Sequence, residues 1–229
     1  MPAPDVKSEP NAGTRRRGRP KQSDADTAAA RARIVAAARD VFAEHGSHAM
    51  SVALIIERAA IARPTFYRYF TNVDEPLQVI LDESDQALVD GLQAALDGAD
   101  DEIAMVVAGI DAYLQWGRNH GPMLRSLFAE LHDPSSSVSP HRERTMAVLR
   151  TRLIARFEAL GRTPPSLVDI DVLLNVFYYV GFRVALAEPG EPVDDDWARL
   201  TMIRIALVQL GTAADLELAA TIPGLLRPV

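Results

Sequence analysis

The sequence contains no cysteine among its 229 residues, so disulfide bonds and thiolate metal sites are excluded. The lack of disulfides fits a reducing cytoplasm, where we expect the protein to reside. Long apolar runs are also missing, because the most hydrophobic segment, 167–186, is interrupted by Asp169, Asp171, Asn175 and Arg183. No apolar stretch follows the first basic residues, so we expect no signal peptide. These absences predict a soluble globular protein with no membrane span.

A catalytic or metal-binding constellation is missing as well. The five histidines are scattered along the chain, at His45, His48, His120, His132 and His141. None has a second histidine at helical spacing with the carboxylates that a metal site needs. The sequence has no glycine-rich phosphate loop. We therefore expect neither an enzyme nor a bound metal or cofactor.

Positive charge is scarce overall but concentrated at one end. The net charge is −7, yet residues 1–75 hold 12 Lys and Arg against 9 Asp and Glu, whereas residues 76–229 hold 12 against 22. A basic run contains no acidic residue and consists of Arg15, Arg16, Arg17, Arg19 and Lys21. This asymmetry indicates a polyanion bound at the N-terminal end. The alternative is a solvated tail.

The pattern after this arm is helical, with no alternating strand pattern and no internal repeat. Residues 1–23 are rich in Pro, Gly, Ser and basic residues, and we expect them to be disordered in the free protein. From about residue 26 the apolar residues Ile34, Ala38, Val41 and Phe42 share one helical stripe, and Gly46 provides a C-terminal stop.

Two short helices should follow this first one. Ser51 can cap the second, and Pro64 suits the first turn of a third that runs to Phe70. A fourth helix should start near Asp74. Phe66 and Phe70 are four residues apart and should face inward against Ile34, Val41, Phe42 and Ile55. The side chains left to project outward or sideways are Arg63, Thr65, Tyr67, Arg68 and Tyr69, whose donors suit phosphates and base edges.

The two long helices expected at about 166–187 and 195–211 differ from the others. The first of them is apolar on nearly every side. Such a helix must be covered on several faces. One face can pack on its own domain and another on a second copy of the chain.

The segments RARIVAAARDVFAEHG and SVALIIERAAIARPTFYRYFTNVDEPL resemble the DNA-binding domain of the TetR family of transcriptional repressors over about residues 31–80. The resemblance implies an all-α fold with an N-terminal three-helix helix-turn-helix domain (24–75) after the arm (1–23). It also implies a C-terminal helical domain (76–229) that binds a ligand and forms a homodimer through the two long helices. The implied DNA-binding residues, with the arm included, are Arg15, Arg16, Arg17, Arg19, Lys21, Ser51, Arg63, Pro64, Thr65, Tyr67, Arg68 and Tyr69.

The roles within this set differ, and alternatives remain. Thr65 and Tyr67 match positions that would hold phosphates, whereas Arg63 and Arg68 are better placed for base edges. Tyr67 and Tyr69 could instead pack in the trihelical core. The arm contains RGRP, which resembles the core of an AT-hook and implies insertion into a narrow minor groove. Alternatively, the arm is an unspecific tether.

The sequence departs from the family pattern at several places. Ala60 stands where the turn usually has glycine, and Ile56 replaces a usual small residue. Residues 52–54 give the second helix an almost apolar start, so we expect few base contacts from it. Val73 and Pro76 replace a usual basic residue and a usual leucine.

An effector pocket is also implied by the resemblance. Its expected lining consists of Tyr113, Trp116, Met123, Leu127, Phe128, Phe177, Tyr178, Phe182 and Arg183, with His132 as a further polar candidate. Alternatively, these aromatic residues are ordinary core. Arg183 needs a partner in its apolar helix, either Asp169 or Asp171 across a dimer or an acidic ligand.

The predicted function is that of a repressor which binds a palindromic operator in double-stranded DNA as a homodimer. A small hydrophobic effector would release it. The alternative is a helix-turn-helix protein that acts mainly through protein partners, with little sequence-specific DNA binding.

Overall fold

The computed structural model describes residues 24–188 and 190–222, which form ten α-helices and no strand. The all-α prediction is therefore confirmed, and the basic arm lies outside the described residues. The helices are α1 (Asp24–Ala49), α2 (Val52–Ala59), α3 (Arg63–Phe66), α4 (Asp74–Asp97), α5 (Glu102–His120), α6 (Met123–Glu130), α7 (Ser139–Ala159), α8 (Leu167–Leu186), α9 (Asp195–Leu210) and α10 (Ala213–Thr221).

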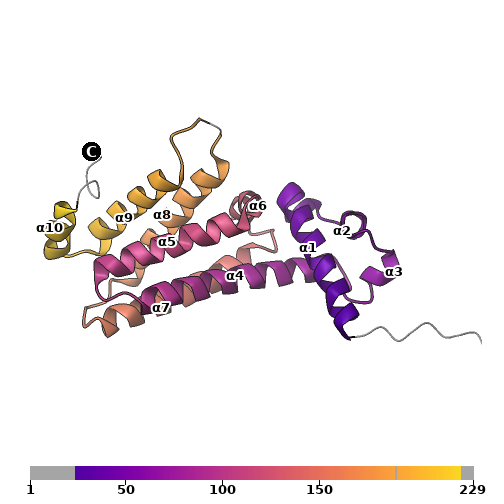
Figure 1. Ribbon diagram of the computed structural model, residues 1–229, viewed down its shortest axis with the longest axis horizontal. Coiled ribbons are helices and arrows are strands. Elements are labelled where there is room, and N and C mark those ends of the chain that lie inside the picture. Colours follow the sequence, from indigo (N-terminus) through magenta and orange to yellow (C-terminus); the bar gives the residue numbers. More distant parts are fainter. Residues whose placement is uncertain (1–23, 189, 223–229) are drawn as a thin grey trace, which may run out of the picture.

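The molecule is elongated, with α1–α3 at one end and α10 at the other (Figure 1). The long helix α4 leaves the first end and packs on α1, α5 and α7. Helix α8 contacts α6, α7 and α9, and α6 in turn lies against α1. Two helices, α4 and α6, therefore join the N-terminal three-helix unit to the larger helical body.

Side-chain caps explain where several of these helices begin. A hydroxyl or carboxylate at the N-cap accepts a hydrogen bond from a backbone N–H that has no partner within the helix. Such caps are Ser51 for α2, Asp101 for α5, Ser166 for α8, Asp194 for α9 and Thr212 for α10.

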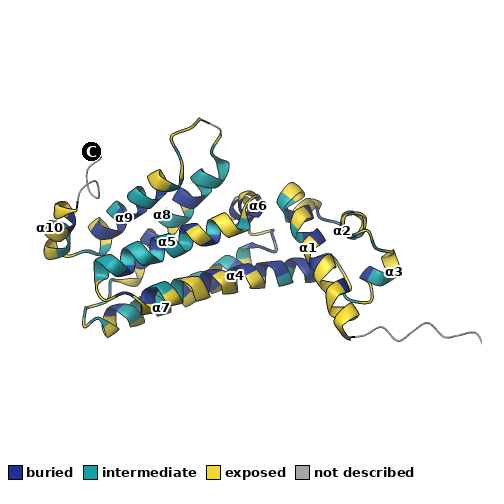
Figure 2. Ribbon diagram, viewed as in Figure 1, coloured by how far each residue is buried: buried dark blue, intermediate teal, exposed yellow. Residues whose placement is uncertain are grey.

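The core of the N-terminal unit is the one that the apolar spacing predicts. Ile34, Phe42, Ile55 and Phe66 are fully buried, and Phe70 is nearly so. These residues belong to a cluster that continues along α4 and into α6 and α7. Buried residues run along α4, while most residues of α2 and α3 are exposed or half-buried (Figure 2). The three-helix unit thus shares its core with the rest of the molecule.

Two helix boundaries differ from the prediction. The first helix is interrupted at Gly46 as expected, but helical structure resumes and ends at Ala49. The third helix ends at Phe66 instead of Phe70. Beyond it the chain continues in tight turns, with hydrogen bonds from the Arg68 N–H to the Thr65 carbonyl and from the Tyr69 N–H to the Phe66 carbonyl. Phe70 still reaches the core because these turns keep a helix-like path.

Ala60 adopts the left-handed conformation (φ 51°, ψ 50°) in which glycine is usual. A Cβ atom makes this conformation costly. We therefore expect Ala60→Gly to raise the free energy of unfolding by about 1 kcal/mol, which is about 2–4 °C in Tm. Thermal unfolding measures the change. The matched control, Ala87→Gly within α4, should lower stability by roughly 1 kcal/mol; equal losses in both variants would contradict this account of the turn.

Among the described residues, no helix combines the length and hydropathy that crossing a membrane requires.

Candidate DNA-binding surface and effector cavity

The turn between α2 and α3 is fixed by short local contacts. The Ser51 hydroxyl accepts a hydrogen bond from the Leu54 N–H at 3.3 Å and starts α2. At the other end, the Ile61 N–H bonds to the Ile56 carbonyl at 3.2 Å, so the chain reverses directly after Ala60. Pro64 lies in the first turn of α3, where a missing N–H has no consequence. The result is a helix-turn-helix whose second helix is very short.

The residues on the outer side of α3 and just after it are exposed to solvent. Arg63, Pro64, Tyr67 and Arg68 are exposed, and Thr65 is half-buried. The Arg63 guanidinium lies 6.0 Å from the centre of the Tyr67 ring, a distance at which cation and ring attract each other. Both side chains therefore lie on the same outward surface.

Tyr69 is placed differently from these residues. Its ring packs against the core, and its hydroxyl is buried without a hydrogen-bond partner among the described residues. This placement favours the packing alternative for Tyr69. Tyr67, in contrast, is 48% exposed, which leaves its hydroxyl free to reach a phosphate.

An ion pair holds α2 against α1. Arg58 near the end of α2 bonds to Glu44 at 2.6 Å and lies 3.7 Å from Asp40. The Arg58 hydrogen bond lowers the pKa of the Glu44 carboxyl, so the pair stays charged at neutral pH. The charge of Arg58 is therefore engaged with α1.

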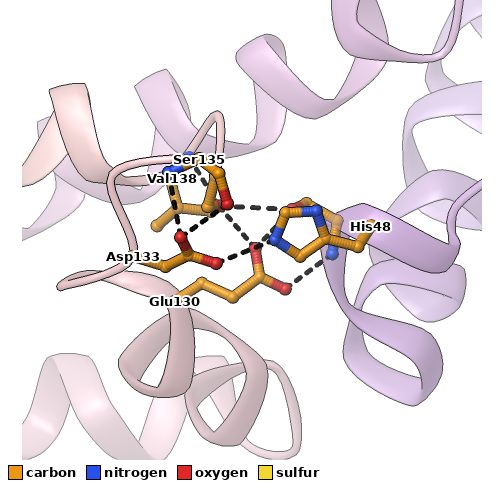
Figure 3. Close-up of polar contacts among 7 residues, drawn as sticks. His48, Glu130, Asp133, Ser135 and Val138 are labelled. Carbon is orange, nitrogen blue, oxygen red and sulfur yellow. Dashed lines mark hydrogen bonds and ion pairs between the residues drawn. The ribbon is translucent and has the colours of Figure 1, made fainter.

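A hydrogen-bond cluster centred on the buried Glu130 connects the end of α1 to α6 and the loop after it (Figure 3). We call it the α1–α6 joint and define it as Ser47, His48, Glu130, Asp133 and Ser136. The Glu130 side chain is 8% exposed and accepts from the Ser47 N–H at 2.7 Å, from the Ser136 hydroxyl at 2.6 Å and from the Ser47 hydroxyl. The His48 Nε2 atom lies 2.9 Å from Asp133. A carboxylate satisfied by three donors fixes the three-helix unit against α6.

The exposed His48–Asp133 pair should make stability depend on pH. The hydrogen bond to Asp133 raises the pKa of His48, and bonds from Ser135 and then His48 lower the pKa of Asp133 to about 2. The stability from His48 is therefore present below its unfolded pKa and lost as the pH rises through its raised folded pKa. The stability from Asp133 is present above its unfolded pKa and lost as the pH falls toward 2.

We expect wild type to exceed His48→Gln in unfolding free energy at about pH 5.5 and to lose this advantage at about pH 8.5. Denaturant titrations of both proteins at the two pH values measure it. A difference that stays constant between them would show that the pair does not titrate in this way.

A cavity of about 150 Å³ lies between α4, α5, α6, α7 and α8. Since one water needs roughly 10–15 Å³ on this scale, a ligand with many heavy atoms would fit. The walls are mostly aliphatic and aromatic. They include Leu88, Leu92, Met105, Ile110, Tyr113, Trp116, Leu127, Phe128, Leu131, Leu149, Leu173, Phe177 and Tyr178.

Six of the residues expected at the effector pocket lie on this cavity: Tyr113, Trp116, Leu127, Phe128, Phe177 and Tyr178. Met123 and Phe182 do not line it, because they pack in the core that joins α6 to the three-helix unit. Arg183 also lies off the lining, and its guanidinium is 3.7 Å from Glu191 in the following loop. His132 is outside as well and packs edge-on against Tyr178 at 4.9 Å.

The expected partners of Arg183 are engaged elsewhere. Asp171 bonds to Arg150 of α7, and Asp169 accepts from Ser166 and Gln209. Within one chain Arg183 has Glu191 as its neighbour, and its pairing with Asp169 or Asp171 across a dimer, or with an acidic ligand, stays a prediction.

Several polar groups of the cavity wall hold neighbouring helices in place. The Tyr113 hydroxyl donates to the Phe177 carbonyl at 3.3 Å, and the Trp116 indole donates to the Ser84 carbonyl at 3.0 Å. Burial raises the pKa of both Tyr113 and Tyr178, so both stay protonated. Tyr178 donates to the Phe128 carbonyl.

The polar part of the lining comes from helices that the sequence-based prediction did not include. These residues are Asp85 of α4 and His141, Arg142, Thr145 and Arg152 of α7. Helix α7 is rich in arginine and shows no clear apolar stripe in the sequence. Positions 142, 145, 149 and 152 are three or four residues apart, and this spacing could have indicated that they share one face of α7.

Comparisons with known proteins agree with this architecture. Residues 34–75 match the family described as "Bacterial regulatory proteins, tetR family". The HTH-type transcriptional activator FasR of Mycolicibacterium smegmatis is 26% identical over 98 residues, which cover 43% of this chain and 45% of that protein. The matched segment thus spans less than half of that relative.

Solved structures share the fold at low identity. SmeT, the repressor of the Stenotrophomonas maltophilia multidrug efflux pump SmeDEF, aligns with a TM-score of 0.64 and 18% identity, over 89% of this chain and 99% of that one. FadR of Bacillus subtilis in complex with stearoyl-CoA aligns with a TM-score of 0.63 and 16% identity, over 79% and 98%. The helix-turn-helix segment therefore matches the tetR family of bacterial regulatory proteins, and the chain shares its all-helical fold with solved regulators of that type.

Proposed function

We propose that this chain binds a palindromic operator as a homodimer and releases it when a small hydrophobic effector enters the cavity. The observation that carries the proposal is the short α3. Its buried Phe66 fixes the segment in the core, while Arg63, Tyr67 and Arg68 are exposed on its outer side. A major groove admits such a helix, and these donors suit phosphates and base edges.

A second copy of the chain would cover the apolar residues exposed on the last long helices. These are Leu167, Val168, Val172 and Tyr179 on α8 and Val208 on α9, all at least 48% exposed. Large apolar patches of this kind mark interaction surfaces. The two-fold symmetry of a dimer would match a palindromic operator.

Helix α6 supplies a route from effector to DNA. Leu127, Phe128 and Leu131 line the cavity at α6, and Glu130 of the same helix holds Ser47 of α1. A ligand that displaces α6 would therefore move the three-helix unit, and with it the separation of the two α3 helices in a dimer. The proteins SmeT and FadR, which share this fold, have been solved with triclosan and with stearoyl-CoA, and this supports a hydrophobic effector.

The dimer can be tested by placing a charge on its proposed surface. Val172→Arg should give a monomer in sedimentation and weaken DNA binding strongly, since a buried unpaired guanidinium opposes association. Glu158→Arg, on the exposed side of α7, is the control and should remain dimeric. A Val172→Arg protein that is still dimeric would place the interface elsewhere.

Footprinting on the DNA that flanks the gene of this chain tests the function itself. Two protected half-sites about one helical turn apart are expected at moderate salt. Uniform, weak protection that disappears as the salt rises would show unspecific binding alone. That result would favour the alternative, in which the protein acts mainly through protein partners. The apolar start of α2 also fits this alternative.

A further inference from the structure

One face of α7 forms a wall of the cavity, and arginines stand at both ends of that face. The lining positions Arg142, Thr145, Leu149 and Arg152 follow a spacing of three or four residues. The two arginines are ten positions apart, which corresponds to roughly 15 Å along a helix. An elongated apolar ligand along α7 would therefore have a cation at either end.

Among the residues that the structure describes, none gives Arg142 a negatively charged partner. Its Nη2 atom donates to the neutral Asn175 side chain at 2.5 Å. Its Nε atom is buried and has no hydrogen-bond partner among the described residues. No carboxylate of residues 24–188 or 190–222 lies within 4 Å of its guanidinium. A buried N–H donor that has lost its water is costly until an acceptor reaches it.

The acidic group of the lining does not supply that acceptor. Asp85 lies 2.9 Å from the Nδ1 atom of His141, whose ring is almost completely buried. The other ring nitrogen of His141 lies 2.7 Å from Gln78. Asp85 is thus engaged with His141, while Arg142 lines a cavity whose walls are mostly apolar. Arg152 differs from Arg142, because no unpartnered buried atom is found on it and it donates to Gln93.

We propose that the effector is an amphipathic carboxylic acid, with its apolar body in the cavity and its carboxylate bound to Arg142. This inference rests on the proposed function, since it specifies the ligand of the same cavity. A carboxylate would accept from Nε and the adjacent Nη of the guanidinium, the paired geometry that arginine favours. The aliphatic and aromatic walls would cover the chain of the acid.

Calorimetric titration of the full-length protein with decanoic acid, 1-decanol and decanoyl-CoA tests this assignment. The alcohol has the same apolar chain without the charge, and the thioester carries its negative charges on a distant group. We expect decanoate to bind at least about tenfold more tightly than decanol, because hydrogen bonds to charged groups are the stronger ones. We also expect it to bind more tightly than the thioester.

Two arginine variants locate the carboxylate. Arg142→Met should abolish the preference for decanoate while the affinity for decanol stays within about threefold, and Arg142→Gln repeats the comparison if the first variant does not fold. Arg152→Met is the matched control at the other end of the cavity and should keep the preference. A preference that survives in Arg142→Met, or that disappears in Arg152→Met instead, overturns the proposal.

Results with wild type alone can also overturn it. These are equal affinity for acid and alcohol, binding of decanoyl-CoA without decanoate, or no binding of any of the three. If decanol releases operator DNA as effectively as decanoate, the inference fails while the proposed function stands. If the protein protects no DNA at all, the proposed function fails whatever the cavity binds.

Discussion

Replacing Gly46 by alanine is expected to lower the free energy of unfolding by about 3 kcal/mol. Gly46 has φ 71° and ψ 175°, a backbone conformation that is open essentially to glycine alone. A Cβ atom at this position would lie 2.5 Å from the Glu130 Oε1 atom. The substitution therefore strains the backbone and forces the central carboxylate of the α1–α6 joint aside. Thermal or denaturant unfolding measures the loss.

A matched control separates this effect from glycine replacement in general. Gly91→Ala in α4 meets no atom within 4 Å and should be neutral or stabilising by up to about 1 kcal/mol. In a Glu130→Ala background, Gly46→Ala should cost less, because the collision is gone and only the backbone strain remains. Equal cost in both backgrounds would mean that Glu130 does not crowd Gly46.

Truncating Phe66 and truncating its neighbour Tyr67 should have opposite consequences. Phe66 is fully buried, so Phe66→Ala should cost about 3–5 kcal/mol and unfold the three-helix unit. Tyr67 is 48% exposed, so Tyr67→Ala should leave Tm nearly unchanged. It should nevertheless weaken operator binding by roughly tenfold, because a phosphate contact is lost.

Calorimetric unfolding together with a DNA-binding titration separates the two roles. A stable Phe66→Ala protein would show that the packing of the Phe66 ring does not hold α3 in the core of the three-helix unit. A strongly destabilised Tyr67→Ala protein would show that this ring is part of the core, which is the alternative that the sequence leaves open.

Local features explain how much could be predicted from the sequence. The helix starting after Ser51, the turn before Pro64 and the inward direction of Phe66 and Phe70 depend on neighbours within a few residues. Caps, proline placement and apolar spacing all report on that range. The length of α3 was overestimated because Tyr67 to Tyr69 keep a helix-like path with turn-type hydrogen bonds. Periodicity does not distinguish these two states.

The contacts between distant segments could not be predicted in this way. Glu130 meets Ser47 across 83 positions, and no local pattern indicates that this acidic residue is buried. The pairing of Arg183 with Glu191 depends on the path of the loop after α8. The polar side of the cavity comes from α7, whose many arginines resemble an ordinary solvated surface. Only the assembled helices show that Arg142 reaches the cavity.

The most direct test is an anisotropy titration of labelled DNA from the region flanking the gene, with wild type and with the Arg63→Ala/Tyr67→Ala double variant. The control is Arg39→Ala, which removes an exposed arginine of α1 that pairs with Glu83 of α4. We expect the double variant to bind roughly 100-fold more weakly and the control to bind within about threefold of wild type. If the double variant binds as tightly as wild type, or if wild type binds no fragment even at low ionic strength, α3 is not the surface that contacts DNA.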